Sequence, residues 1–274
     1  MFSEKSFDAV YAVTHYGLEA LIFLRALGLY RKPIVIWHHA EMIIPSNRIR
    51  RIFSKLFYKG IDKVCFFSQY LLDRSIKTGK IKKENAFVVH WGADIVFYDT
   101  IISQDRENKF VSTGRENRDF ITLIKAFNVT SELCDIYIPS HFNYRSLLDR
   151  EGIKINANIR ISFVNMERLD IAKAADNAFA IVISCLDITS YPLGLTSLVE
   201  AMALGLPVIT TDNPAYPIDV EKENTGLKVP YKDVNAWIKA IQYLSANPDK
   251  AKEMGKMLVC WLKRNIIWNF LQKK

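Results

Sequence analysis

The chain has 274 residues, of which 50% are hydrophobic and 24% charged, with only 11 Gly and 9 Pro. This composition excludes a disordered, fibrous or low-complexity protein, because such chains have fewer apolar residues or far more Gly and Pro. The formal net charge of +8 at pH 7 is compatible with an anionic partner, such as nucleic acid, anionic lipid or a phosphorylated small molecule. The length suits two domains.

The excess of positive charge lies in residues 47–83. This segment contains 11 Lys and Arg residues against two Asp, so the rest of the chain is nearly neutral. The charge is therefore a local patch and not a property of the whole surface.

The four Cys residues are far apart and form no CxxC or Cys/His cluster. This spacing predicts free thiols in a reducing compartment and no structural zinc. The first residues, MFSEKSFDAV, lack the layout of a signal peptide. No apolar stretch approaches the ~18 residues that span a bilayer. We expect a cytoplasmic protein that meets the inner face of the membrane only peripherally.

Short β-branched or aromatic runs alternate with longer helical patterns along the chain. Strands are expected over residues 7–13, 34–37, 63–68, 86–90, 109–113, 134–139, 159–164, 178–184, 207–211 and 226–230. Helices are expected over residues 16–28, 46–59, 69–78, 118–129, 143–151, 167–175, 197–204, 233–246 and 249–272. Runs such as AIVIS and PVITT are apolar on both faces, which is typical of parallel strands covered by helices. The alternation predicts an α/β protein with parallel sheets.

A domain boundary is expected near residues 98–108, where the apolar periodicity lapses and polar residues collect. Each side of this stretch begins its own strand–helix series. We therefore expect one domain over residues 1–100 and another over residues 101–260. The C-terminal helix, at residues 261–274, could pack back on the first domain.

Residues 190–212, SYPLGLTSLVEAMALGLPVITTD, indicate a loop, a helix, a tight turn and a strand. Gly194 opens the segment, and Thr196 or Ser197 caps the helix. A helix that follows a Gly-containing loop presents free backbone N–H groups and the positive end of its dipole, which suits a phosphate. Glu200 lies one turn in, where it could accept hydrogen bonds from sugar hydroxyls. Ser197 and Glu200 also have the spacing of a capping box, in which the glutamate only returns to the cap N–H.

Residues 110–127, FVSTGRENRDFITLIKAF, form a second cluster. A strand ends at Gly114, Arg115 and Arg118 follow, and an amphipathic helix begins. Guanidiniums at the carboxyl edge of a parallel sheet stand where open α/β folds bind ligands, and they suit a diphosphate. The alternative is that Arg118 is a solvated residue at the helix start, paired with Asp119.

Taken in order, the two clusters resemble the C-terminal domain of family 4 glycosyltransferases, which have the GT-B fold. The resemblance rests on GR…RDF…LIKAF and, some 75 residues later, on GLTSLVEAMALGLPVITTD. KPIVIWHHA, KVCFFSQYL and VVHWGAD resemble segments of the family's N-terminal domain, and NIRISFVNMERLDIAKAADNAFAIVIS resembles the stretch between the two clusters. The resemblance implies two Rossmann-like domains that bind a nucleotide-sugar.

The resemblance also implies roles for single residues. Arg115 and Arg118 would stabilise the departing diphosphate together with the helix N-terminus, which comprises Gly194, Leu195, Thr196 and Ser197. Glu200 would hold the ribose, Val164 would line the nucleobase, and His39 would lie near the donor sugar, with His38 as the alternative register. The family retains anomeric configuration and needs no divalent metal, so no cofactor and no metal site are expected.

The chain departs from the family pattern in two places, which weakens the assignment of the family's residue roles to this chain. The family usually has a second glutamate eight residues before Glu200, where this chain has Pro192. The family's first strand and its glycine-rich loop are also absent, because the histidine already comes at position 39. We therefore expect an incomplete N-terminal domain.

Residues 47–63 suggest a further partner. In NRIRRIFSKLFYKG the apolar side chains of Ile49, Ile52, Phe53, Leu56 and Phe57 form a helical stripe flanked by Arg and Lys. Such a helix could lie on an anionic membrane surface; alternatively, it is an ordinary helix whose stripe packs on the sheet. Nucleic-acid binding is not expected, because the cations are not interleaved with exposed aromatic residues.

Three functions remain open from the sequence. The first is a retaining glycosyltransferase that moves a sugar from a nucleotide-diphosphate donor to a glycan or lipid-linked acceptor in surface polysaccharide or glycolipid biosynthesis. The second is a catalytically inactive or partner-dependent remnant that binds nucleotide. The third is a sugar-nucleotide epimerase, which shares the fold.

Overall fold

The computed structural model describes residues 7–102, 106–114, 117–140, 144–164 and 168–267. The chain divides into two compact units. Unit 1 comprises Met1–His90 and the short segments Thr189–Pro192 and Pro214–Pro217, and unit 2 comprises Trp91–Ile188, Leu193–Asn213 and Ile218–Lys274. The first continuous stretch of unit 1 thus ends at His90, whereas the boundary predicted from the sequence lies near residue 100.

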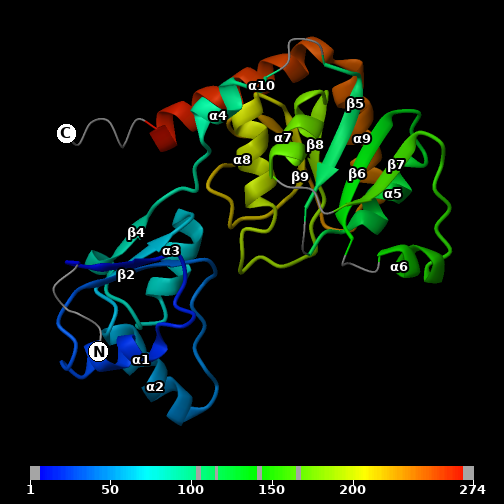
Figure 1. Cartoon of the computed structure of the whole chain (residues 1–274). Coiled ribbons are helices and arrows are strands. Elements are labelled where there is room, and N and C mark those ends of the chain that lie inside the picture. Colours follow the sequence, from blue (N-terminus) through cyan, green and yellow to red (C-terminus); the bar gives the residue numbers. More distant parts are fainter. Residues whose placement is uncertain (1–6, 103–105, 115–116, 141–143, 165–167, 268–274) are drawn as a thin grey trace. The chain divides into compact units, whose positions relative to one another are not determined.

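Unit 1 is a parallel sheet with the strand order β1-β2-β3-β4 (Figure 1). Its strands are β1 (Val10–Ala12), β2 (Ile34–His38), β3 (Lys63–Phe66) and β4 (Ala86–Val88). The connecting helices are α1 (Glu19–Ala26), α2 (Arg48–Lys59), α3 (Gln69–Ile76) and the 3-10 turn η1 (Lys83–Asn85). Fully buried aliphatic and aromatic residues from α1, α3 and the two central strands form its interior: Ile22, Ile34, Ile36, Val64, Phe66 and Leu71.

Unit 2 is a larger parallel sheet with the strand order β10-β9-β8-β5-β6-β7. Its strands are β5 (Lys109–Thr113), β6 (Leu133–Pro139), β7 (Ile159–Val164), β8 (Ala180–Ile183), β9 (Val208–Thr211) and β10 (Gly226–Val229). Its helices are α4 (Ile95–Asp99), α5 (Phe120–Phe127), α6 (Tyr144–Arg150), α7 (Arg168–Asp176), α8 (Leu195–Leu204), α9 (Val234–Ala246), α10 (Pro248–Leu262) and the π-helical turn η2 (Lys263–Ile267).

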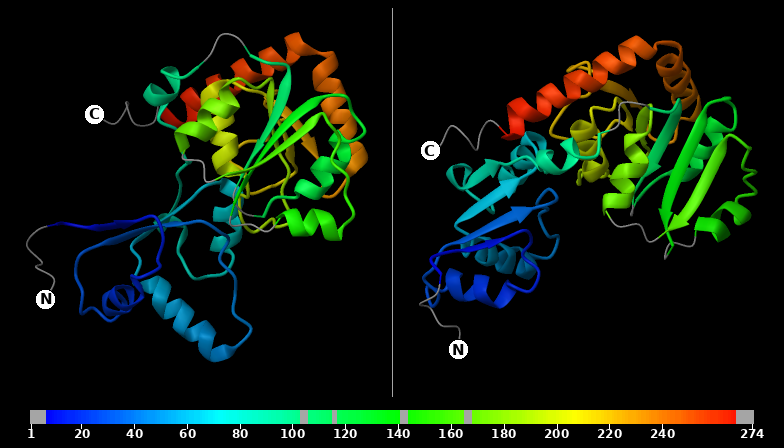
Figure 2. Two further views of the ribbon diagram at one scale, coloured as in Figure 1. Left: turned by 45° about the vertical axis from the view of Figure 1, so that its right-hand side comes forward. Right: turned by 45° about the horizontal axis from the view of Figure 1, so that its top comes forward.

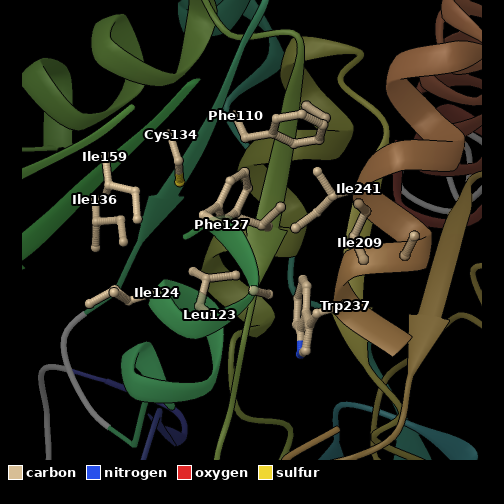
Figure 3. Packing of buried hydrophobic residues seen from close by; sticks show 14 of the residues in the cluster. Phe110, Leu123, Ile124, Phe127, Cys134, Ile136, Ile159, Ile209, Trp237 and Ile241 are labelled. Carbon is tan, nitrogen blue, oxygen red and sulfur yellow. The ribbon is translucent and has the colours of Figure 1, made fainter. Parts of the chain in front are cut away.

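Helices cover both faces of the unit 2 sheet (Figure 2). Helices α5 and α9 contact each other on one face, and α7 and α8 pack against β5 and β8. Figure 3 shows how Phe110 of β5, Phe127 of α5 and Trp237 of α9 meet in the core of the first layer. All four residues of β8 and of β9 are buried, as expected for strands that are covered on both sides.

The strand order of unit 2 indicates where this unit would bind a ligand. The chain enters the sheet at β5, proceeds to β6 and β7 on one side, and then returns to β8 on the other side of β5. The direction of winding therefore reverses between β5 and β8. In open α/β sheets, ligands bind at the carboxyl ends of the strands at such a switch point.

The structure confirms the predicted α/β class and all ten predicted strands. Several helix predictions are wrong in their bounds, and one helix was missed. Helix α4 was not predicted, because five residues are too few to show a periodicity. Helix α8 begins at Leu195 and not at residue 197. The last helix begins at Pro248, ends at Leu262 and continues as η2, which belongs to unit 2.

Among the described residues, no helix combines the length and the apolar character that crossing a bilayer would require.

Candidate functional site

The loops that follow β5 and β8 are joined by backbone hydrogen bonds at the switch point. Arg118 and Cys185 form an antiparallel bridge. The Asp119 N–H donates to the Ser184 carbonyl at 3.0 Å, and the Leu186 N–H donates to the Asn117 carbonyl at 2.9 Å. These bonds fix the two loops to each other at the carboxyl edge of the sheet.

The side chain of Arg118 lies inside this junction and is only 7% exposed. Its Nε donates to the Thr113 carbonyl at 3.3 Å, and its Nη2 donates to Ser197 Oγ at 3.2 Å. Nη1 lies 3.6 Å from Cys185 Sγ. The guanidinium is therefore held between the end of β5 and the first turn of α8, and the interpretation of Arg118 as a solvated residue is wrong.

Asp119, the suggested partner of Arg118, caps the following helix. Its Oδ1 accepts from the Thr122 N–H at 3.0 Å, and its Oδ2 accepts from the Thr122 hydroxyl at 2.7 Å. The Ser184 hydroxyl donates to the Asp119 carbonyl at 2.8 Å. The aspartate thereby orients helix α5 at the site.

Gly114 makes room for the arginine. A Cβ at this position would lie 2.2 Å from Arg118 Nε, and the backbone φ of +154° disfavours other residues. A side chain at residue 114 would therefore displace the guanidinium or bend the loop.

The amino terminus of α8 faces the same junction. Gly194, with φ +86°, is its N-cap residue and has no side chain that could cap the helix. The first intrahelical bond runs from the Leu198 N–H to the Gly194 carbonyl. The N–H groups of Leu195, Thr196 and Ser197 precede it and need partners from outside the helix ladder. An anion beside these N–H groups would accept hydrogen bonds from them and would interact favourably with the positive end of the helix dipole.

The capping-box interpretation of Ser197 and Glu200 is wrong, because α8 begins before Ser197. Ser197 is the third residue of the helix, and its Oγ lies 3.2 Å from Thr113 Oγ1. Glu200 lies in the second turn and is 8% exposed. Its carboxylate therefore does not act as the N3 residue of a cap.

The structure brings Arg118, Gly194, Leu195, Thr196 and Ser197 together at the carboxyl edge, with Glu200 on the same helix. Arg115 lies outside the described residues, so its place in the site stays a prediction. Val164 ends β7 as predicted, but its side chain is likewise outside the description.

His39, which is predicted to lie near the sugar, and the alternative residue His38 both belong to unit 1, at the carboxyl end of β2. Both ring nitrogens of His38 are used within the protein: Nδ1 lies 2.7 Å from the Ala40 carbonyl and Nε2 lies 2.7 Å from Tyr58 Oη. Burial lowers the pKa of His38 to about 4. His38 is therefore a neutral, internally bonded residue.

His39 differs from its neighbour. Its Nε2 is buried and has no hydrogen-bond partner within the described chain. Burial lowers the pKa of His39, and a backbone hydrogen bond with Val13 opposes this shift. Of the two adjacent histidines, His39 is the one whose Nε2 has no partner within the described chain. Its place near the donor sugar stays a prediction.

In the described parts of the chain, no three His, Cys, Asp or Glu side chains gather in a way that could hold a metal ion. At the described carboxyl edge, the guanidinium of Arg118 and the N–H groups at the start of α8 supply positive electrostatic potential. The expectation of a metal-free site remains a prediction.

Two contacts of Arg118 were not predicted from the sequence. From the sequence, Cys185 has no predicted role at the site, although its place just after β8 puts it at the same sheet edge as Arg118. The Tyr144 hydroxyl donates to the Arg118 carbonyl at 2.7 Å. No sequence signal connects Tyr144 to this site, because the contact depends on how α6 packs.

The second unit is thus a doubly wound α/β sheet with a buried arginine beside a helix amino terminus at its switch point. Residues 152–257 match the family model of the glycosyl transferases group 1. The match includes α8 and Glu200 but not Arg118. No curated protein matches the chain in sequence.

Solved structures match nearly the whole chain. A glycosyltransferase from Rickettsia africae ESF-5 is 16% identical with a TM-score of 0.75, over 97% of this chain and 74% of that one. Anabaena Alr3699/HepE in complex with UDP is 16% identical with a TM-score of 0.73, over 98% and 79%. Sucrose-phosphate synthase from Thermosynechococcus elongatus is 18% identical with a TM-score of 0.73, over 98% and 72%. The chain has the GT-B fold, and within its second unit residues 152–257 match the model of the glycosyl transferases group 1.

Proposed function

We propose that the protein is a retaining glycosyltransferase that moves a sugar from a nucleotide-diphosphate donor to a glycan or lipid-linked acceptor. The observation that carries this proposal is the position of Arg118. Its guanidinium is bonded to Ser197 in the first turn of α8, so a fixed cation and an uncapped helix terminus converge on one point of the carboxyl edge. Such a point suits a diphosphate.

Leaving-group stabilisation is the chemical contribution of these groups. Negative charge develops on the β-phosphate as the bond from the anomeric carbon to the phosphate oxygen breaks. Preorganised donors near that oxygen lower the barrier without reorganising during the reaction. Arg118 is preorganised by Thr113, Ser197 and Gly114. Arg115 is proposed as the second cation, on the family resemblance.

The rest of the donor would extend from the diphosphate. Glu200 is proposed to accept hydrogen bonds from the ribose hydroxyls, and Val164 to line the nucleobase. His39 is proposed to face the donor sugar, which its unbonded Nε2 supports. Anabaena HepE has been solved with UDP and with UDP-glucose, which supports a nucleotide-sugar donor for this chain. Because the arginines and the helix supply positive charge, we propose that transfer needs no metal or other cofactor.

The proposed acceptor is a component of surface polysaccharide or glycolipid, glycosylated in the cytoplasm or at the inner face of the membrane. The concentration of cations in residues 47–83 supports an acceptor or a surface that carries negative charge.

A second candidate is a protein that binds the nucleotide without transferring the sugar. Pro192 motivates it, because proline has no side-chain polar group to contact sugar hydroxyls where the family usually has a glutamate. Under this alternative the diphosphate site of Arg118 and α8 would be intact but the sugar would not be held for attack.

Single-turnover assays with a panel of UDP- and GDP-sugars test the proposal. Arg118→Ala and Arg115→Ala should each lower the rate of sugar release or transfer by at least about 10²-fold, as expected for the loss of one leaving-group donor. Arg150→Ala is the matched control, since Arg150 is an exposed arginine at the end of α6.

The outcomes separate the candidates. Unchanged turnover in Arg118→Ala would overturn the mechanism. Nucleotide binding by the wild type without turnover would support the second candidate. Conversion of the donor into a stereoisomeric nucleotide-sugar, without loss of the nucleotide, would identify an epimerase.

A further inference from the structure

Helix α2 carries an unusual charge. Its sequence, RIRRIFSKLFYK, contains five Arg and Lys residues and no acidic residue. The Asn47 side chain caps it by accepting from the N–H groups of Ile49 and Arg50. The helix is thus locally well formed, although none of its residues is buried.

The apolar stripe of α2 divides into two parts. Near the carboxyl end, Phe57 packs edge-on against Phe23 of α1, with ring centroids 5.5 Å apart. Nearer the amino end, Ile49, Ile52 and Phe53 are 65%, 69% and 57% exposed. The first turns of α2 project away from α1 and from the strands of unit 1 (Figure 2). The stripe therefore does not pack on the sheet, and that alternative is wrong for its first half.

The loop before α2 adds to this exposed apolar surface. Ile43 and Ile44 are 69% and 54% exposed. The guanidinium of Arg51 donates to the Pro45 carbonyl at 3.4 Å, which ties the loop to the helix. We define the α2 patch as these apolar residues and the cations between them: Ile43, Ile44, Arg48, Ile49, Arg50, Arg51, Ile52, Phe53, Lys55 and Lys59.

The cations of the α2 patch are available to a partner. All five are exposed, and within the described chain none forms an ion pair. Positive charge without carboxylate partners raises the local potential and favours a surface of negative charge. Large exposed apolar side chains among these cations favour a partner that also removes them from water.

We propose that the α2 patch docks on an anionic lipid bilayer, with α2 lying in the interface. An anionic bilayer satisfies both features of the patch, since its headgroups attract Lys and Arg while its acyl boundary accepts Ile and Phe. A nucleic acid would engage the cations but leave the isoleucines in water. A 12-residue helix is about 18 Å long, too short to cross a hydrocarbon core of about 30 Å, so it lies along the surface.

The inference deepens the proposed function, because it would place the chain where lipid-linked acceptors lie. Its test does not depend on glycosyl transfer: vesicle binding is measured without donor or acceptor. Failure of one proposal therefore leaves the other standing.

Co-sedimentation with phosphatidylcholine vesicles, containing or lacking phosphatidylglycerol, tests the α2 patch. The wild type should bind the vesicles with phosphatidylglycerol. Ile49→Ser/Ile52→Ser/Phe53→Ser should weaken this binding at least about tenfold, because the apolar contacts are lost. Arg48→Gln/Arg50→Gln/Lys55→Gln should weaken it about a hundredfold, at about fivefold for each cation.

The matched controls lie in unit 2. Lys250→Gln/Lys252→Gln/Lys256→Gln removes three exposed cations from α10, and Val129→Ser removes an apolar side chain that is 66% exposed. Both should bind as the wild type does. Circular dichroism of each variant checks folding, and Ile52→Ser alone replaces the triple variant if the latter does not fold.

Three results would overturn the inference. The first is wild-type binding that does not depend on phosphatidylglycerol. The second is undiminished binding of the folded serine variant, which would reduce the contact to ionic adsorption. The third is binding of single-stranded RNA in place of vesicles, with the same dependence on the glutamine variant.

Discussion

The carboxyl edges of the two sheets are built from the same strand–helix units but satisfy their polar groups differently. In unit 2, the buried Arg118 is bonded to Thr113 and Ser197. In unit 1, His38 is fully bonded while the adjacent His39 keeps one buried nitrogen without a partner in the described chain. The comparison indicates that the described carboxyl edge of unit 2 holds its arginine rigidly, whereas that of unit 1 keeps a buried histidine nitrogen without a described partner.

The largest effect is expected in the core beneath the unit 2 site. Phe127 is fully buried and packs 5.5 Å from Phe110, centroid to centroid. Phe127→Ala should lower the unfolding free energy of unit 2 by about 3–5 kcal/mol. Urea denaturation followed by tryptophan fluorescence measures it, and Phe66→Ala is the counterpart in unit 1. A loss below about 1 kcal/mol for Phe127→Ala would contradict the packing described for this unit.

The two units should respond differently to acid. The folded-state pKa of His38 is about 4, below the ~6.5 of an unfolded histidine, so the unfolded state binds the proton more readily. The contribution of His38 to the stability of unit 1 should therefore be constant above pH 6.5 and fall by up to about 3 kcal/mol as the pH drops towards 4. His38→Gln should flatten this dependence in denaturation curves between pH 7 and 5. An identical slope in the variant would show that His38 is not the cause.

Gly114→Ala should break the unit 2 site without removing any of its polar groups. The new Cβ would collide with Arg118 Nε, so we expect about a hundredfold loss in kcat/KM, close to that of Arg118→Ala. Gly152→Ala is the matched control, because Gly152 also has a positive φ (+62°) but open space around it. Equal activity of the two glycine variants would contradict the role given to the position of Arg118.

The smallest effect concerns the ribose. Glu200→Gln removes the charge but keeps a hydrogen-bonding group, so the affinity for a nucleoside diphosphate should fall about tenfold, the value of one charge-assisted bond. Calorimetric titration measures this affinity. Glu253→Gln, on the outer face of α10, should leave it unchanged. Equal affinity in the two variants would remove Glu200 from the nucleotide site.

Much of the fold could be predicted from the sequence, because β8 and β9 are continuous apolar runs and α5 and α9 begin at Asp residues that cap them. The position of α8 could not be predicted to the residue. Thr196 and Ser197 are both good caps, and only the left-handed backbone of Gly194 shows that the helix starts earlier. Because α8 starts at Leu195 and not at residue 197, Ser197 and Glu200 do not form a capping box, and the first N–H groups of the helix are left for a ligand.

The residues of the site that directly follow strands could be predicted from the sequence. The contacts that depend on how helices pack could not. Arg118 and Ser197 follow neighbouring parallel strands, so their meeting at one sheet edge follows from the strand order. The contact of Tyr144 and the division of the α2 stripe between Phe57 and Ile52 depend on how helices dock. Local patterns do not encode these contacts.

The central claim is that the carboxyl edge of unit 2 binds a nucleoside diphosphate through Arg118 and the amino terminus of α8. Calorimetric titration of the wild type and of Arg118→Ala with UDP and with GDP tests it most directly. The account predicts saturable binding of one of these nucleotides by the wild type, and at least a tenfold weaker affinity in the variant. Equal affinities in the two proteins, or no binding of either nucleotide by the wild type, would contradict it.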